Sequence, residues 1–204
     1  NAGIESVATC VPLKADDVAG LKDFVVREQI DLTVVGPEAP LALGIVDEFR
    51  NANLRIFGPT KNAARLEASK IFSKDVMAQA RIPTARAKSF DKAVDALAYL
   101  EQHELPVVIK ADGLAQGKGV VIATTREEAR EAVIGSMEKA MFGQAGKRVL
   151  IEQFLDGEEL TVMAFTDGRT VVPMLPAQDH KRVGDADTGL NTGGMGAYCP
   201  APLG

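Results

Sequence analysis

Hydrophobic positions in the first part of the chain alternate between helical and strand-like spacing. The pattern predicts a helix over Val18–Ile30, a strand at Leu32–Val35, a helix over Leu41–Asn51 and a strand at Leu54–Phe57. Short apolar runs rich in β-branched residues and closed by Gly-Pro are typical of buried parallel strands. Two strand–helix units in succession predict a parallel sheet of the doubly wound α/β kind.

The next segment has the four-residue spacing of one long helix. We expect this helix over Thr60–Ala80, where an apolar residue recurs every four positions: Ala64, Ala68, Phe72, Val76 and Ala80. Pro83 ends the pattern, and a further helix is predicted over Ser89–Glu101.

From Pro106 onward the pattern becomes strand-like. The strands expected are Val107–Lys110, Gly119–Ala123 and Arg148–Phe154, and the segments Leu160–Phe165 and Thr170–Leu175 form a hairpin over the turn at Asp167 and Gly168. Thr125 and Glu128 have the spacing of a capping box, which predicts the start of a helix that runs to Met141.

Composition narrows the function classes. The chain has 204 residues, 46% of them hydrophobic and 25% charged, with a net charge of −5. This is the profile of a globular protein without a basic surface for nucleic acid. No apolar run approaches the ~20 residues that span a membrane, and the four cysteines and histidines are too few for a disulfide framework or a metal cluster. We therefore expect a cytoplasmic protein with no nucleic-acid or membrane partner.

A glycine-rich loop joins the strands that end at Lys110 and begin at Gly119. Glycines let backbone N–H groups approach phosphates, and strand alternation directs Lys110 to the face opposite Val107 and Ile109. Lys118 lies between two glycines, from which it can reach terminal phosphates. A mobile hairpin tip with an exposed lysine is the alternative interpretation.

Three other segments carry candidate chemistry. The turn after Phe154 offers backbone groups for an adenine base, and Glu159 offers a carboxylate for a ribose diol; an acidic surface turn is the alternative. Lys70 and Lys74 lie one helical turn apart, either at a phosphate or on a solvated face. Glu38 follows a Gly-Pro strand end, where open α/β sheets bind ligands.

The polar run Gln178–Tyr198 contains four glycines after Thr188. Ordering such a run is costly unless it closes around a ligand. Lys181 and Arg182 offer cations for anionic oxygens, and Asn191 offers a neutral hydrogen bond. Disorder of the segment is the competing interpretation.

Together these segments resemble the glycinamide ribonucleotide synthetase family of ATP-grasp enzymes. The similarity extends over essentially the whole chain, and the run from Gln178 to Tyr198 is the most specific to the family. It implies a truncated parallel-sheet N-terminal domain followed by a partial ATP-grasp domain, with the lid subdomain and the start of the central subdomain. The boundaries we expect are 1–88, 89–157 and 158–204.

The resemblance also implies roles for individual residues. Nucleotide contacts fall on Lys70, Lys110, Gly117, Lys118, Gly119, Glu152, Leu155, Glu159, Arg182 and Asn191. Lys110 and Arg182 would act on the transferred phosphoryl group, whereas Glu38, Asp179 and Lys181 would contact substrate. No metal ligand is assigned within the chain, because the ligands of the catalytic Mg²⁺ are expected beyond Gly204.

The reaction implied joins glycine to 5-phosphoribosylamine through glycyl phosphate, with ATP converted to ADP. The first and last residues, Asn1 and Gly204, do not look like natural ends, so we expect a piece of a longer and monomeric enzyme, inactive by itself and able to self-associate through an open strand edge. The rival interpretations are another ATP-grasp carboxylate–amine ligase and a non-catalytic nucleotide-binding fragment.

Overall fold

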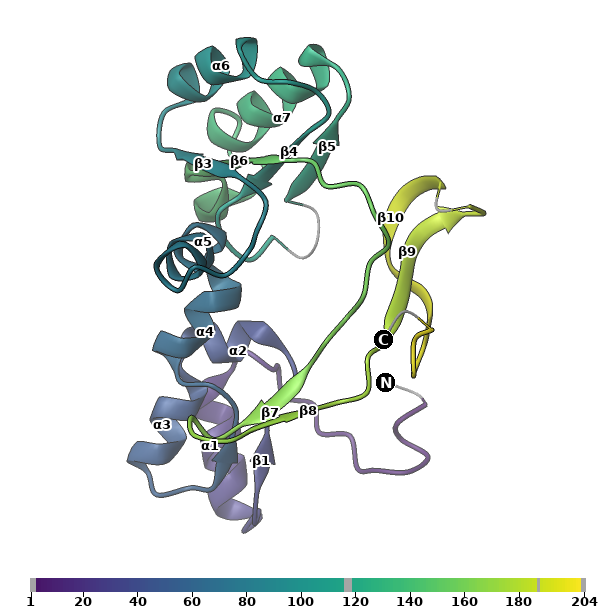
Figure 1. Ribbon diagram of the computed structural model, residues 1–204. Helices are drawn as coiled ribbons and strands as arrows, with labels where there is room; N and C mark the ends of the chain where they lie inside the picture. The colour runs from purple at the N-terminus through teal and green to yellow at the C-terminus, as the bar shows by residue number, and fades with distance from the viewer. Residues whose placement is uncertain (1–2, 116–118, 187, 203–204) are drawn as a thin grey trace. The chain divides into compact units, whose positions relative to one another are not determined.

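The computed structural model describes residues 3–115, 119–186 and 188–202, which form two compact units, residues up to Phe154 and residues from Leu155 onward (Figure 1).

The first unit begins with the predicted strand–helix alternation. Its elements are α1 (Val18–Arg27), β1 (Thr33–Val34), α2 (Glu38–Leu43), α3 (Ile45–Asn51) and β2 (Ile56–Phe57). β1 and β2 pair in parallel, as the two strand–helix units predicted. A small core of Val25, Ile45, Val46 and Phe49 holds α1 against α3.

The predicted helix over residues 41–51 is two helices, because Gly44 interrupts it. Gly44 adopts the left-handed conformation at φ 95° and serves as C-cap of α2 and N-cap of α3. Such a conformation is accessible to glycine without a Cβ clash, so the chain can turn here and continue as a second helix.

The prediction of one continuous helix over Thr60–Ala80 is wrong, because the segment is interrupted at Ser69. It consists of α4 (Lys61–Ala68) and α5 (Lys70–Gln79), separated by Ser69 in an extended conformation. The Ser69 side chain caps α5 by accepting a hydrogen bond from the Phe72 N–H, and it donates one to Asp112, 43 residues further along the chain. The spacing of alanines could not reveal this long-range contact.

The second part of this unit is a four-stranded antiparallel sheet in the order β3-β6-β4-β5. Its strands are β3 (Ala87–Phe90), β4 (Val107–Ala111), β5 (Val120–Ala123) and β6 (Val149–Gln153), and its helices are α6 (Ala93–Glu101), α7 (Arg126–Met137) and the 3₁₀ turn η1 (Gly143–Lys147). The prediction of a helix from Ser89 was wrong at its start, because residues 87–90 pair with β6.

The helices α6 and α7 lie on one face of this sheet (Figure 1). The core between them is formed by alternating strand residues and by helix residues: Phe90, Ala96, Leu100, Val107, Ile109, Ala123, Ala129, Val133, Val149 and Ile151. The capping box predicted at α7 is present, since the Thr125 hydroxyl accepts from the Glu128 N–H and the Glu128 carboxylate accepts from the Thr125 N–H. The opposite face of the sheet does not contribute to this core.

The second unit consists of two hairpins. β7 (Ala164–Thr166) and β8 (Val171–Pro173) pair over the turn predicted at Asp167 and Gly168. β9 (Gln178–Gly184) and β10 (Thr188–Tyr198) pair with irregular register. The sequence pattern assigned no element to residues 177–196, because the glycines interrupt the alternation typical of a strand.

Candidate functional site

The face of the sheet opposite α6 and α7 carries the charged residues. Lys110 pairs with Leu150 across β4 and β6, and Val108 pairs with Glu152, so these four side chains share that face. Val107 and Ile109, which alternate with them, are buried in the core on the other face. The direction predicted for Lys110 from strand alternation is confirmed.

Glu152 is the centre of an ion-pair cluster on this face. Its side chain is 5% exposed, and its two carboxylate oxygens have different partners: Oε1 lies 2.5 Å from Lys74 Nζ, and Oε2 contacts Lys110 Nζ. A buried carboxylate is stable only if it is paired, so both lysines are needed to offset its desolvation. The sequence placed Lys74 either at a phosphate or on a solvated face and implied a nucleotide contact for Glu152, but it did not predict the ion pairs between these side chains.

The two lysines differ in their surroundings. Besides Glu152, the Lys74 ammonium donates to Thr84 Oγ1 at 2.7 Å and to the Ala85 carbonyl at 2.8 Å. Within the described part of the chain, Glu152 is the one ion-pair partner of the Lys110 ammonium. The Lys74 side chain is 15% exposed and that of Lys110 is 28% exposed. Lys110 is therefore the cation more accessible to a ligand.

A second polar cluster fixes the start of α5 to the end of β4. Asp112 accepts hydrogen bonds from the Ser69 hydroxyl at 2.9 Å and from the Ile71 N–H at 3.1 Å, and it forms an ion pair with Arg148. Lys70 donates to the Gly113 carbonyl at 2.9 Å. Asp112 and Arg148 were not predicted, since neither belongs to a recognisable spacing.

Burial lowers the pKa of Lys70 from its ordinary value, with a smaller lowering from Lys110, while the nearby carboxylates of Glu67 and Asp112 act in the opposite direction. Desolvation disfavours an ammonium ion that has only partial compensation. A half-buried lysine with this environment is suited to an anionic ligand that restores its missing interactions.

The sheet face beside Lys110 also has an apolar part. Val120 pairs with Lys110 and Ile122 pairs with Val108, so both point to this face, and they are 37% and 38% exposed. Two exposed apolar side chains beside a lysine match the needs of a nucleotide, whose base is flat and apolar and whose phosphates are anionic. The predicted contacts Gly117 and Lys118 lie outside the described residues, and Gly119 immediately precedes β5.

Four of the other predicted residues lie in the second unit, namely Glu159, Asp179, Lys181 and Arg182. Lys181 Nζ is 2.7 Å from Glu159 Oε2 and 3.6 Å from Asp179 Oδ2, and Arg182 donates to the Gly189 carbonyl at 2.6 Å. The hydrogen bond to Glu159 raises the pKa of Lys181 above its ordinary value. The structure thus joins three of the predicted residues.

The structure also locates Leu155, Asn191 and Glu38 in the chain. Leu155 is 62% exposed, and Asn191 pairs with Arg182 through the backbone, its side chain being outside the described set. Glu38 begins α2, and among the described residues no hydrogen bond or ion pair links it to the lysine–Glu152 cluster.

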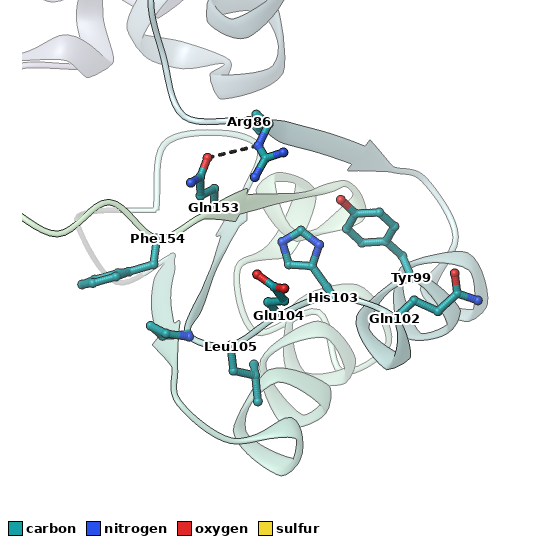
Figure 2. Close-up of a pocket in the computed structure, with 9 residues that line it drawn as sticks. Arg86, Tyr99, Gln102, His103, Glu104, Leu105, Gln153 and Phe154 are labelled. Atoms are coloured by element: carbon teal, nitrogen blue, oxygen red, sulfur yellow. Dashed lines mark hydrogen bonds between the residues drawn. The ribbon is translucent and has the colours of Figure 1, made fainter.

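A surface pocket not anticipated from the sequence lies near the end of β6 (Figure 2). Arg86 donates to Gln153 Oε1 at 3.3 Å, and the rings of Tyr99 and His103 lie 4.9 Å apart. The pocket shares no lining residue with the cluster around Glu152. Throughout the described ranges, no group of three His, Cys, Asp or Glu side chains has metal-binding geometry, so we assign no metal ligand.

Comparisons with solved structures give the class of fold first. The chain is similar to biotin carboxylase from Campylobacter jejuni, with 17% identity and a TM-score of 0.70 over 81% of this chain and 38% of that one. This likeness concerns the fold alone. A closer neighbour is phosphoribosylamine–glycine ligase from Thermotoga maritima, with 33% identity and a TM-score of 0.76 over 98% of this chain and 48% of that one. The fold is that of an ATP-grasp protein preceded by a parallel α/β domain.

Family models and curated relatives then identify the family. The phosphoribosylglycinamide synthetase N domain matches residues 1–67, and the ATP-grasp (A) domain of the same family matches residues 68–204. Phosphoribosylamine–glycine ligases of Escherichia coli K12 and Haemophilus influenzae are 55% and 54% identical over the whole chain. The chain belongs to the phosphoribosylglycinamide synthetase family. It spans 48% of the length of these two relatives.

Proposed function

We propose that the protein carrying this chain joins glycine to 5-phosphoribosylamine with the conversion of ATP to ADP. The observation that carries the proposal is the sheet face that holds Lys110 and Glu152 beside the exposed side chains of Val120 and Ile122. The relatives that match over the whole chain are named for this ligase activity, which supports the choice of substrates.

In the proposed reaction, a carboxylate oxygen of glycine attacks the γ-phosphorus of ATP, and the bond to the β–γ bridging oxygen breaks to release ADP. The amine of phosphoribosylamine then attacks the carbonyl carbon of glycyl phosphate, which releases inorganic phosphate and a proton. Such a transfer requires positioned reactants and neutralised charge rather than a covalent enzyme intermediate.

The first unit would supply cations to the phosphates. The ammonium of Lys110 lies on this sheet face, and the ammonium of Lys70 lies beyond the end of β4, at the Gly113 carbonyl. Both lysines are partly buried and have therefore lost part of their hydration. Cations placed where charge develops in the transition state lower its energy most effectively in a site that excludes water. Lys110 would act on the transferred phosphoryl group, while the backbone after Glu152 would contact the base.

For the second unit we propose the roles that the family resemblance implies. Glu159 would accept a hydrogen bond from a ribose hydroxyl, and Arg182, with Asn191, would contact phosphate oxygens. Asp179 and Lys181, and Glu38 in the first unit, would contact substrate. We further propose that ATP binds together with Mg²⁺, whose protein ligands lie outside this chain. We also propose that the enzyme is monomeric and that it acts in the cytoplasm.

Calorimetry tests the binding half of this proposal. ATP should bind the wild-type chain, and Lys110→Met, which keeps the length of the side chain without its charge, should weaken binding by about tenfold, the loss expected for one charge-assisted contact. Lys92→Met, at the N-cap of α6 on the other side of the sheet, is a matched control that should leave the affinity unchanged. Equal affinities of the Lys110 and Lys92 variants would exclude the proposed site.

An assay of ADP release tests the chemical half. The protein that carries the chain should form ADP continuously only when glycine and phosphoribosylamine are both supplied, because glycine alone allows at most one glycyl phosphate and one ADP per enzyme. Continuous ADP formation with another amino acid at the same rate, or without phosphoribosylamine, would assign a different ligase or a simple ATPase.

A further inference from the structure

The two lysines that pair with Glu152 differ in their number of hydrogen-bond partners and in their exposure. Lys74 lies on α5, and its ammonium has three acceptors: Glu152 Oε1, Thr84 Oγ1 and the Ala85 carbonyl. An ammonium has three N–H donors, so its hydrogen-bonding capacity is filled. Its side chain is also the less exposed of the two, 15% against 28% for Lys110.

This inequality matters when a ligand arrives. If Lys110 turns toward a phosphate, Glu152 loses one of its two cations while it stays 5% exposed. A buried carboxylate left without a counterion is strongly destabilised. The departure of Lys110 is therefore possible at moderate cost only if another cation remains on Glu152 throughout.

We propose that Lys74 is a positioning residue that keeps Glu152 ionised and fixed, so that Lys110 is free to exchange its carboxylate partner for a phosphate of ATP. This inference rests on the proposed function, because it assigns Lys110 to ATP. Lys74 is the resident counterion of Glu152, and Lys110 is the exchangeable one. Lys74 itself does not touch the nucleotide.

A double-mutant cycle on ATP affinity separates this role from a purely structural one. In Lys74→Met the carboxylate retains Lys110, so the Kd for ATP should rise by about tenfold, close to the effect of Lys110→Met. In the Glu152→Gln background there is no carboxylate to hold Lys110, so the same Lys74→Met change should alter the Kd by less than about threefold. Lys74→Arg, which keeps the charge, should stay close to wild type.

The outcomes are distinct. A tenfold loss in both backgrounds, or no loss in either, overturns the role of Lys74 while the proposed function stands. Failure of the wild-type chain to bind millimolar ATP overturns the inference about Lys74, whereas the proposed function fails only if the protein that carries the chain forms no ADP with glycine and phosphoribosylamine. Circular dichroism identifies variants that do not fold; if Lys74→Met is one of them, Lys74→Gln, which removes the charge and keeps a hydrogen-bond donor, replaces it in the cycle with the same expected values.

Discussion

The buried carboxylate of Glu152 on β6 joins residues that are far apart in the chain, because its two lysines come from α5 and β4. Strand alternation is sufficient to direct Lys110 to the face opposite Val107 and Ile109, which are buried in the core. Lys74 could not be assigned, since its partners Thr84, Ala85 and Glu152 lie up to 78 residues away and meet it only in the folded chain.

Neutralising Glu152 should destabilise the fold. Glu152→Gln keeps the shape of the side chain but leaves the mostly buried ammonium of Lys74 without an opposite charge, so the free energy of unfolding should fall by about 3 kcal/mol in denaturant titrations. Glu48→Gln is the control, because its ion pair with Lys22 is exposed and is worth at most ~1 kcal/mol. Equal losses in the two variants would contradict the buried ion-pair cluster.

Lys70 gives a prediction about pH. Because burial lowers its pKa, its ammonium should lose its proton at a lower pH than ordinary lysines do. If Lys70 contacts phosphate, ATP affinity should decline as pH rises through that lowered pKa, before most lysines titrate. NMR of ¹⁵N-labelled lysine side chains gives the titration, and calorimetry at several pH values gives the affinity. A Lys70→Met variant that retains the same alkaline decline would assign it to another group.

At the scale of elements, local signals predicted the helix and strand starts that depend on neighbouring residues. The capping box of α7 is the clearest example, because Thr125 and Glu128 satisfy each other's backbone N–H groups within one turn. The breaks at Gly44 and Ser69, and the irregular pairing of β9 with β10, depend on tertiary contacts or on glycines that break the alternation.

Removing the cap should weaken α7 measurably. Thr125→Ala leaves the Glu128 N–H without its side-chain acceptor, and the free energy of unfolding should decrease by about 1 kcal/mol. No change in the denaturant midpoint of this variant would show that the cap does not support the fold.

The other half of the cap should respond to acid. Hydrogen bonds from the backbone and hydroxyl of Thr124, and from the backbone of Thr125, lower the pKa of Glu128. A carboxylate whose pKa is lowered by folding stabilises the fold at any pH above its pKa in the unfolded chain. This contribution is lost as the pH falls through its pKa in the folded chain. The stability difference between wild type and Glu128→Gln should therefore shrink on acidification; a constant difference would contradict the assignment.

Replacing the glycine at the junction of α2 and α3 should destabilise the fold. Gly44→Ala places a Cβ on a residue with φ 95°, 3.3 Å from Lys61 Cδ, and should cost about 1 kcal/mol of unfolding free energy. Gly36→Ala is the matched control, since its added Cβ meets nothing within 4 Å. Thermal unfolding distinguishes the two variants, and an equal change in both would contradict the strained turn.

For the whole molecule, the strand–helix alternation predicted a parallel α/β domain, and the family resemblance implied that an ATP-grasp domain follows it. The family models confirm this order. The roles of individual site residues remain predictions. Nucleotide contacts depend on side-chain positions that arise from packing between distant segments, as in the pairing of α5 with β6 through Lys74 and Glu152.

In the described part of the chain, no helix has the length and apolar character needed to cross a bilayer. The proposed ligands are small, charged molecules, and every proposed role depends on where ATP binds.

A crystal structure of the chain with a non-hydrolysable ATP analogue locates that site directly. The account predicts the base against Val120 and Ile122, a phosphate oxygen within hydrogen-bond distance of Lys110 Nζ, and Lys74 still on Glu152. Adenosine bound instead in the pocket of Tyr99 and His103 (Figure 2), with Lys110 unmoved from Glu152, would contradict it.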